Sequence, residues 1–170
     1  DGTLVFLPHV GNLSRSIVIR SENPNGTPGH VLFTDRATVD VHYALFKDLG
    51  RTDAFRGIDN YDSHSGHIGT NQIGRYAVHC HHVLNPCTFV GNAVDGGRKG
   101  GIVIHHTSFG LVKWNVIYDV DGAGIVTEDG SEIEYVIEEN FIVRVEGTGC
   151  DRCDDRPNGQ QWHGGEAIWL

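Results

Sequence analysis

The sequence predicts an all-β fold, a right-handed parallel β-helix in which residues 1–170 form one domain. Two series of residues that recur along the chain predict this fold. Asn precedes a short apolar run at positions 92, 115 and 140, and Gly precedes another at positions 74, 100 and 122. Both series imply a solenoid with coils of about 22 to 26 residues, whose strands pair with those of the next coil. Apolar stripes at the helical period and a Leu-rich consensus are absent, which argues against helical and leucine-rich repeats.

The N-terminal part of the chain alternates short β-branched runs with loops. Residues 16–20 and 30–33 are predicted strands, separated by a loop whose Gly and Pro residues interrupt regular structure. Apolar and polar residues then alternate over residues 37–46. This period of two predicts a strand in which Val41 faces the core and His42 faces outward.

A long segment without periodicity follows, over residues 51–72, and it is rich in Asp, Ser, Asn and Gly with His64 and His67. Such a stretch inside a compact domain is either disordered or a functional loop. It leads directly into the histidine-rich run of residues 74–82, which favours the functional loop. We therefore expect a long excursion from the β-helix at this point.

Both ends of the sequence predict that the chain is a fragment of a longer protein. It begins with Asp1, contains no Met and shows no signal peptide. Residues 164–170 resume the pattern of a coil and then stop without the capping element that usually closes a solenoid.

The overall charge restricts the partners of the chain. A net charge of -9 with only 13 Lys and Arg residues argues against nucleic acid, because phosphate binding depends on clustered cations. An acidic polysaccharide would also be repelled unless a local patch of Arg and His, or a bound cation, attracts it. No apolar run reaches the length of a membrane-spanning segment.

The cysteines and two sequence motifs favour an extracellular, secreted or cell-surface location. The four cysteines form two close pairs, Cys80 with Cys87 and Cys150 with Cys153. Their even number and spacing predict two local disulfides, with a redox or metal-binding role as the alternative. Asn12 and Asn25 each begin an N-glycosylation motif, a short pattern that also occurs by chance.

The histidines of residues 74–82 are the strongest candidates for chemistry. If Tyr76 and Val78 face the core, His79 and His81 face outward, because alternate side chains of a strand share a face. Stacking of the coils then predicts two outer columns, one of His79, His105 and Thr127, and one of His81, Thr107 and Asp129.

Some of these side chains are expected to converge, since neighbouring coils lie about 4.8 Å apart. The expected catalytic group is His79, His81, His105 and Asp129. The expected substrate-binding residues are Arg75, His42, His82 and His106. His and Asp can divide the donation and acceptance of a proton near neutral pH. As outward side chains they are expected to contribute little to the core.

Two other interpretations of this patch stay open. Stacked side chains can form a purely structural ladder, which is the role expected for Asn92, Asn115 and Asn140 at the turns. The patch can also hold a divalent cation: histidines with a carboxylate suit zinc or another transition ion. Carboxylates with backbone carbonyls suit calcium instead, and residues 151–155 contain three aspartates that are candidates for it.

The most specific run of the chain is Gly-Arg-Tyr-x-x-His-x-His-His, at residues 74–82. Together with residues 13–21, 29–34, 39–43 and 48–52 it resembles the β-helix region of the G8-domain-containing protein family, which includes the cell-migration-inducing and hyaluronan-binding protein. Two residues depart from the family pattern: Cys80 replaces an aromatic residue, and His42 stands where Arg is common. The resemblance implies a β-helix, a G8 domain that belongs before Asp1 and is absent here, and an association with hyaluronan depolymerisation.

Two functions therefore remain at this point. The first is an extracellular β-helix that binds a polysaccharide and cleaves it as a hyaluronidase-like glycosidase or lyase, with calcium or zinc as candidate cofactors. The second is a non-catalytic structural or adhesive surface module. A groove open to solvent beside the excursion of residues 51–72 favours the first, and a histidine face covered by packing favours the second.

Overall fold

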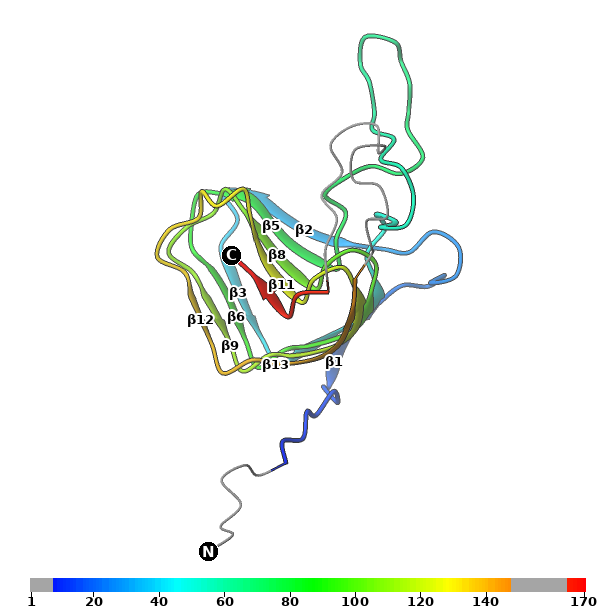
Figure 1. The fold of residues 1–170 in the computed structure, drawn as a ribbon. Helices are drawn as coiled ribbons and strands as arrows, with labels where there is room; N and C mark the ends of the chain where they lie inside the picture. Colours follow the sequence, from blue (N-terminus) through cyan, green and yellow to red (C-terminus); the bar gives the residue numbers. More distant parts are fainter. Residues whose placement is uncertain (1–7, 148–164) are drawn as a thin grey trace, which may run out of the picture.

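The chain winds into a parallel β-helix of three sheets, in a computed structural model that describes residues 8–147 and 165–170 (Figure 1). Sheet A contains β1 (Ile17–Arg20), β4 (Ala44–Leu49), β7 (Ala93–Gly97), β10 (Val116–Asp121) and β13 (Phe141–Glu146). Sheet B contains β2 (Val31–Asp35), β5 (Val78–Val83), β8 (Ile102–His105), β11 (Ile125–Glu128) and β14 (Ile168–Trp169). Sheet C contains β3 (Val39–His42), β6 (Cys87–Val90), β9 (Leu111–Lys113) and β12 (Val136–Glu138). All of these strands pair in parallel, which confirms the predicted fold. In the part of the chain that the structure describes, no helix is long and apolar enough to cross a membrane.

The coil length follows from the positions that pair between neighbouring strands. Val116 pairs with Ala93 and with Phe141, which lie 23 and 25 positions away and within the predicted range. The first coil is slightly longer, since Ile17 pairs with Ala44, 27 positions away. The second coil is much longer because it contains the segment between β4 and β5.

The inner faces of the three sheets enclose an apolar core. Its largest fully buried side chains are Phe46, Phe89, Ile102, Ile104, Ile117 and Ile125. Burial of each side chain of this kind contributes roughly 1.5–3 kcal/mol. A disulfide between Cys80 and Cys87 joins β5 to β6 inside this core, whereas Cys150 and Cys153 lie outside the described residues.

Asn92, Asn115 and Asn140 form a ladder at the corner that precedes the strands of sheet A. The Oδ1 atom of Asn115 accepts hydrogen bonds from the backbone N–H (2.9 Å) and the side-chain amide (3.1 Å) of Asn92. The Oδ1 atom of Asn140 likewise accepts hydrogen bonds from the backbone N–H and the side-chain amide of Asn115, both at 3.0 Å. Because these side chains satisfy backbone groups that the corner would leave unpaired, the expected structural role of the ladder is confirmed.

A second corner, at the end of the sheet B strands, has a left-handed backbone. Asp35, His82, His106 and Asp129 have φ values of 56°, 54°, 47° and 66° there. Asp and His are among the residues that tolerate this conformation best. The corner gathers polar side chains at the rim of the sheet: the rings of His82 and His106 stack with centroids 4.6 Å apart.

Residues 51–72 leave the β-helix between β4 and β5 and project away from it (Figure 1). The side chain of Asn71 holds the base of this excursion by donating hydrogen bonds to three backbone carbonyls at 3.0 to 3.2 Å. The carboxylate of Asp59 accepts hydrogen bonds from the backbone N–H (2.7 Å) and hydroxyl (2.9 Å) of Thr70 and contacts the ring of His67. The excursion therefore has a hydrogen-bonded structure of its own.

Candidate functional site

The candidate site lies on the outer face of sheet B, over β5, β8 and β11. His81 pairs with His105, and His105 pairs with Glu128, so these three residues form one outer column. His79 pairs with Val103 instead of His105. The two predicted columns, of His79, His105 and Thr127 and of His81, Thr107 and Asp129, are therefore wrong.

Three residues that were placed in or beneath those columns lie elsewhere. Thr127 is in register with the core residue Ile104, because alternation along β11 turns Glu128 outward instead. Thr107 is buried, and its hydroxyl accepts a hydrogen bond from the backbone N–H of Val83 at 3.0 Å. Tyr76, expected to face the core with Val78, belongs to a second apolar cluster on the outer face of sheet B, with Val103 and Val126.

His79, His105 and Glu128 converge at the centre of the site. The Oε2 atom of Glu128 lies 3.4 Å from Nδ1 of His105 and 3.9 Å from Nε2 of His79. The rings of His79 and His105 are parallel to within 2°, and the ring of His81 lies edge-on beside both, with centroids 5.1 and 4.9 Å away. Asp129 contacts the other ring nitrogen of His105, with its Oδ2 atom 3.0 Å from Nε2 of that residue. The structure thus brings the three expected histidines together, but the carboxylate between them is Glu128.

Hydrogen bonds hold the two most buried members of this cluster in place. Nδ1–H of His79 donates to the carbonyl oxygen of Gly74 at 2.7 Å, which leaves Nε2 without a proton. That Nε2 atom has no hydrogen-bond partner among the described residues, although His79 is only 1% exposed. The hydroxyl of Tyr76 donates to Oε1 of Glu128 at 2.5 Å and leaves Oε2 facing the histidines.

Burial changes the protonation of these groups. It lowers the pKa of His79 to about 3, against the opposing effect of the hydrogen bond to Gly74. The pKa of His81 is also lowered, first by burial and then by the neighbouring histidines. Burial raises the pKa of Glu128, and the hydrogen bond from Tyr76 only partly opposes this. At neutral pH His79 and His81 are therefore neutral imidazoles, each with a free lone pair.

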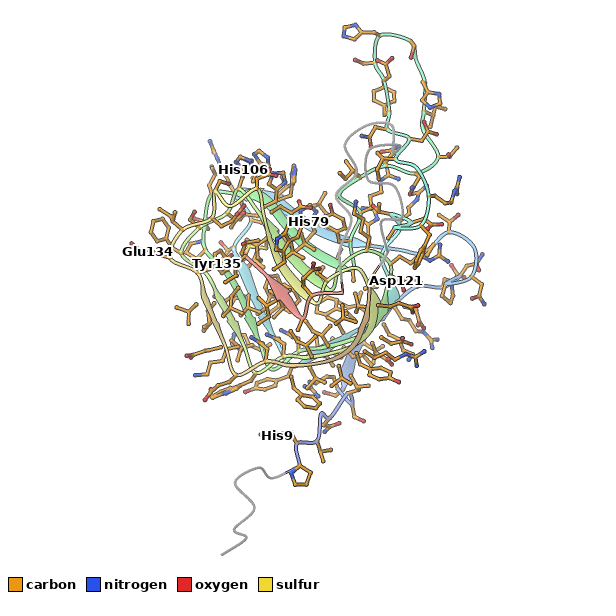
Figure 2. The ribbon with its side chains drawn as sticks, in the orientation of Figure 1. His9, His79, His106, Asp121, Glu134 and Tyr135 are labelled. Atoms are coloured by element: carbon orange, nitrogen blue, oxygen red, sulfur yellow. A yellow bond between two sulfur atoms is a disulfide. The ribbon has the colours of Figure 1, made fainter. Side chains whose placement is uncertain are left out.

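Two adjoining hollows open over this cluster. Figure 2 labels His79 of this cluster and, at the corner of the coils, His106. The first, which we call the carboxylate hollow, has a volume of about 190 Å³ and is lined by Tyr76, His105, Glu128 and Asp129 together with shared residues. The second, the arginine hollow, has a volume of about 350 Å³ and is lined by His30, Leu32, Arg51 and Arg75 together with the same shared residues. The shared residues are Ile73, Gly74, His79 and His81. Together the two hollows form a groove along the outer face of sheet B.

The base of the excursion forms one wall of the arginine hollow. Arg51 and Thr52 donate their backbone N–H groups to the carbonyl oxygen of Arg75 at 2.7 and 3.1 Å. The hydroxyl of Thr52 accepts from the backbone N–H of Arg75 at 3.0 Å and donates to the carbonyl of Gln72 at 2.7 Å. The backbones of both arginines are thereby fixed at the edge of the groove, as expected for Arg75, whose guanidinium also donates to Oε1 of Gln72.

His42 does not join this site, contrary to the expected substrate-binding set. It ends β3 in sheet C, and its Nε2 atom contacts Asp40 at 2.6 Å. His82 and His106 lie at the rim of the site but line neither hollow. Asn12 and Asn25 are exposed, and their glycosylation stays a prediction.

Sequence reasoning missed four residues of the groove, which are Glu128, His30, Leu32 and Arg51. Glu128 could have been found by counting the alternation from Ile125, the first residue of β11. His30 and Arg51 carry no such signal, because only the folding of successive coils brings these loop residues beside β5.

Comparison with known proteins places the fold in a family. The sequence model of the CEMIP β-helix matches residues 63–163, which include the histidine run and the three strands of the site. Fibrocystin-L of Mus musculus is 34% identical over 85 residues, or 47% of this chain, and human Fibrocystin-L is 33% identical over 79 residues, or 44%. The matched part is about 2% of the length of each of these relatives. No solved structure matches the chain.

Proposed function

This chain belongs to the CEMIP β-helix family, and on that basis we propose that its groove binds an acidic, hyaluronan-like polysaccharide and that the groups beneath the groove cleave it. The observation that supports the proposal best is the division of the groove. One half is lined by two arginines and the other by a histidine and carboxylate cluster.

The arginine hollow supports the choice of an acidic sugar. Guanidinium groups bind carboxylates through paired, charge-assisted hydrogen bonds, so Arg51 and Arg75 suit a uronic acid. A chain with a net charge of -9 would repel a polyanion elsewhere on its surface. Two arginines fixed in one hollow provide the local attraction that binding of such a polymer requires.

The carboxylate hollow supports cleavage as well as binding. His81 lines both hollows, and its lowered pKa keeps it neutral and able to accept a proton at neutral pH. A sugar whose carboxylate contacts Arg75 would place the adjoining linkage over His81 and the cluster of His79, His105 and Glu128. We assign His81 the role of accepting a proton from the water molecule that attacks the linkage, while the bond from the sugar carbon to the bridging oxygen breaks and that oxygen takes up a proton from solvent. The carboxylate of Glu128 would stabilise the positive charge that develops on the sugar ring.

The groove also bears on the alternative of a purely structural or adhesive module. Such a module needs its coils to stack, but it does not need buried polar atoms that face an open hollow. The Nε2 atom of His79 lies beneath the groove with no hydrogen-bond partner in the described part of the chain, and this feature favours chemistry over stacking alone.

A depolymerisation assay on the full-length protein tests the proposal. Hyaluronan and a neutral glycan of similar length would be incubated with the protein, and their size distributions followed by chromatography. We expect hyaluronan to shorten and the neutral glycan to stay intact. Arg75→Gln should weaken hyaluronan binding, whereas His81→Gln should leave binding intact and slow cleavage by about 100-fold or more.

Two exposed residues away from the groove provide matched controls. Arg36→Gln removes a cation, and His64→Ala removes a histidine at the excursion, and neither residue lines a hollow. Both variants should retain binding and cleavage. Binding without cleavage would support the adhesive module, and absence of both from the wild-type protein would reject the groove as a polysaccharide site.

A further inference from the structure

We infer that Nε2 of His79, Nδ1 of His105 and Oε2 of Glu128 bind one divalent transition metal ion of the zinc class. The inference deepens the proposed function, because it assigns a chemistry to the cluster beneath the groove. It rests on the geometry of the three side chains, and it can be tested without any polysaccharide.

The spacing of the three atoms fits a metal centre. They all lie within 4.8 Å of one another, with separations from Glu128 Oε2 of 3.4 Å to His105 and 3.9 Å to His79. Ligands bound at about 2.0–2.1 Å in a tetrahedral arrangement stand roughly 3.4 Å apart. Small movements of side chains therefore suffice for all three atoms to coordinate one ion.

The burial of His79 supports a ligand at this point. Its side chain is 1% exposed, and its Nε2 atom faces Glu128 across 3.9 Å without a hydrogen-bond partner among the described residues. A buried polar atom left without a partner is costly and rare in folded proteins. A bound cation would satisfy this lone pair.

Each of the three ligands also has an outer partner that fixes its orientation. Nδ1–H of His79 donates to the Gly74 carbonyl, and the Tyr76 hydroxyl donates to the second oxygen of Glu128. Nε2 of His105 lies 3.0 Å from the Asp129 carboxylate, so that a proton on this nitrogen leaves Nδ1 free to coordinate. Backbone carbonyls and carboxylates behind histidine ligands are the usual outer shell of zinc sites.

The ligand types select the class of metal. Two imidazole nitrogens and one carboxylate suit zinc and similar transition ions, whereas calcium takes several oxygen ligands. The carboxylate hollow leaves the remaining side of the site open, as in catalytic rather than purely structural metal sites. When bound there, such an ion would polarise an oxygen of the substrate or lower the pKa of a water molecule.

Two alternative groups of ligands share His105 and define the competing outcomes of the test. One is His81 with His82 and His105, and the other is His105 with His106 and Asp129. Both include exposed side chains at the corner of sheet B, and neither contains the buried Nε2 atom of His79.

Metal binding to the full-length protein provides the test. The protein would be stripped with a chelator and titrated with Zn²⁺ against a chromophoric competitor. In parallel, Co²⁺ would be added to reveal the intense visible absorption of four-coordinate cobalt. We expect one ion per chain, and we expect His105→Gln and Glu128→Gln each to weaken binding at least 100-fold. Tyr76→Phe should weaken it by about 10-fold, since it removes only an outer partner.

The controls separate this site from its neighbours and from the proposed function. His82→Gln and His106→Gln should leave the affinity for Zn²⁺ within about threefold of the wild type. His79→Gln should behave like His105→Gln, and circular dichroism would verify that each variant is folded. Failure to bind Zn²⁺, or loss of binding in the His82 or His106 variant with retention in the His79 and Glu128 variants, would overturn the inference. Metal binding without hyaluronan cleavage would leave this inference standing and reject the proposed function.

Discussion

His79 shows how far a single residue can depart from its expected role. As an outward side chain on a solenoid it was expected to contribute little to the fold. The structure instead buries it beside Tyr76 of the second apolar cluster, with the two ring centroids 4.8 Å apart. Outward-facing therefore does not mean exposed here, because Tyr76, Gly74 and the rings of His81 and His105 surround this side chain.

Asn115 provides a test of the ladder at the scale of one residue. Its Oδ1 atom accepts two hydrogen bonds from Asn92, and its amide donates to the carbonyl of Phe89 at 2.9 Å, all in a fully buried position. Asn115→Ala should lower the free energy of unfolding by about 3 kcal/mol or more, because it leaves several buried polar groups unpaired at roughly 1–3 kcal/mol each. Urea denaturation followed by circular dichroism measures the change.

An asparagine outside the ladder provides the control for this substitution. Asn85 is exposed, and its side chain donates hydrogen bonds to two backbone carbonyls, at 3.1 and 3.4 Å, where water can replace it. Asn85→Ala should change the stability by less than about 1 kcal/mol. Equal effects of the two substitutions would show that the ladder does not act as a unit.

At the scale of the strand, the sequence predicted the fold but not the register of the site. The Asn series identified the coils correctly, because Asn92, Asn115 and Asn140 stack on one another. The glycine series predicted the wrong register between the strands of sheet B, because the number of residues from each glycine to the following strand varies. Gly74 lies four residues before β5, Gly100 two residues before β8 and Gly122 three residues before β11.

These unequal turns explain both errors in the predicted columns. An error of two residues keeps a side chain on the same face, so His79 and His105 remain on one surface although they are not partners in the register. An error of one residue reverses the face, so the prediction placed Thr127 outward and overlooked Glu128. Turn lengths depend on tertiary packing, and a single sequence does not reveal them.

The excursion is a separate element, and its stability should depend on pH. The contact with His67 and the hydrogen bonds from Thr70 lower the pKa of Asp59 from its ordinary value of 3.8 to about 2. A depressed folded pKa means that the ionised carboxylate stabilises the excursion above pH 3.8, and that this contribution is lost as the pH falls towards 2. We therefore expect the excursion to open in acid before the β-helix unfolds.

Hydrogen exchange across residues 51–72 measures this opening. The amide of Thr70 should lose protection between about pH 4 and pH 2, whereas amides of β8 should keep theirs. Asp59→Asn should produce the same local loss at neutral pH. A simultaneous loss of protection in the excursion and in β8 would show that the excursion is not an independent element.

At the scale of the whole molecule, the positions of the charged residues affect the binding of a polyanion more than the net charge does. The net charge of -9 opposes the approach of a polyanion, while Arg51 and Arg75 concentrate positive charge at the groove. Both arginines lie close enough to His30 to help lower its pKa, after the larger effect of burial. His30 is therefore neutral at physiological pH, and the arginines alone carry the positive charge of this hollow.

Added salt should have two opposing effects on hyaluronan binding, and the net result should be weaker binding. Between 0.1 and 1 M salt the screening length falls from about 10 Å to about 3 Å, which reduces both the attraction of the arginines and the repulsion of the remaining surface. Because the arginines would contact the sugar directly, while most acidic residues lie farther away, the attraction dominates and affinity should fall as salt rises. In Arg51→Gln combined with Arg75→Gln only the repulsion remains, so added salt should then improve residual binding. Binding isotherms at several salt concentrations, with a neutral glycan as control, would reveal this change of sign, and a wild-type affinity independent of salt would contradict it.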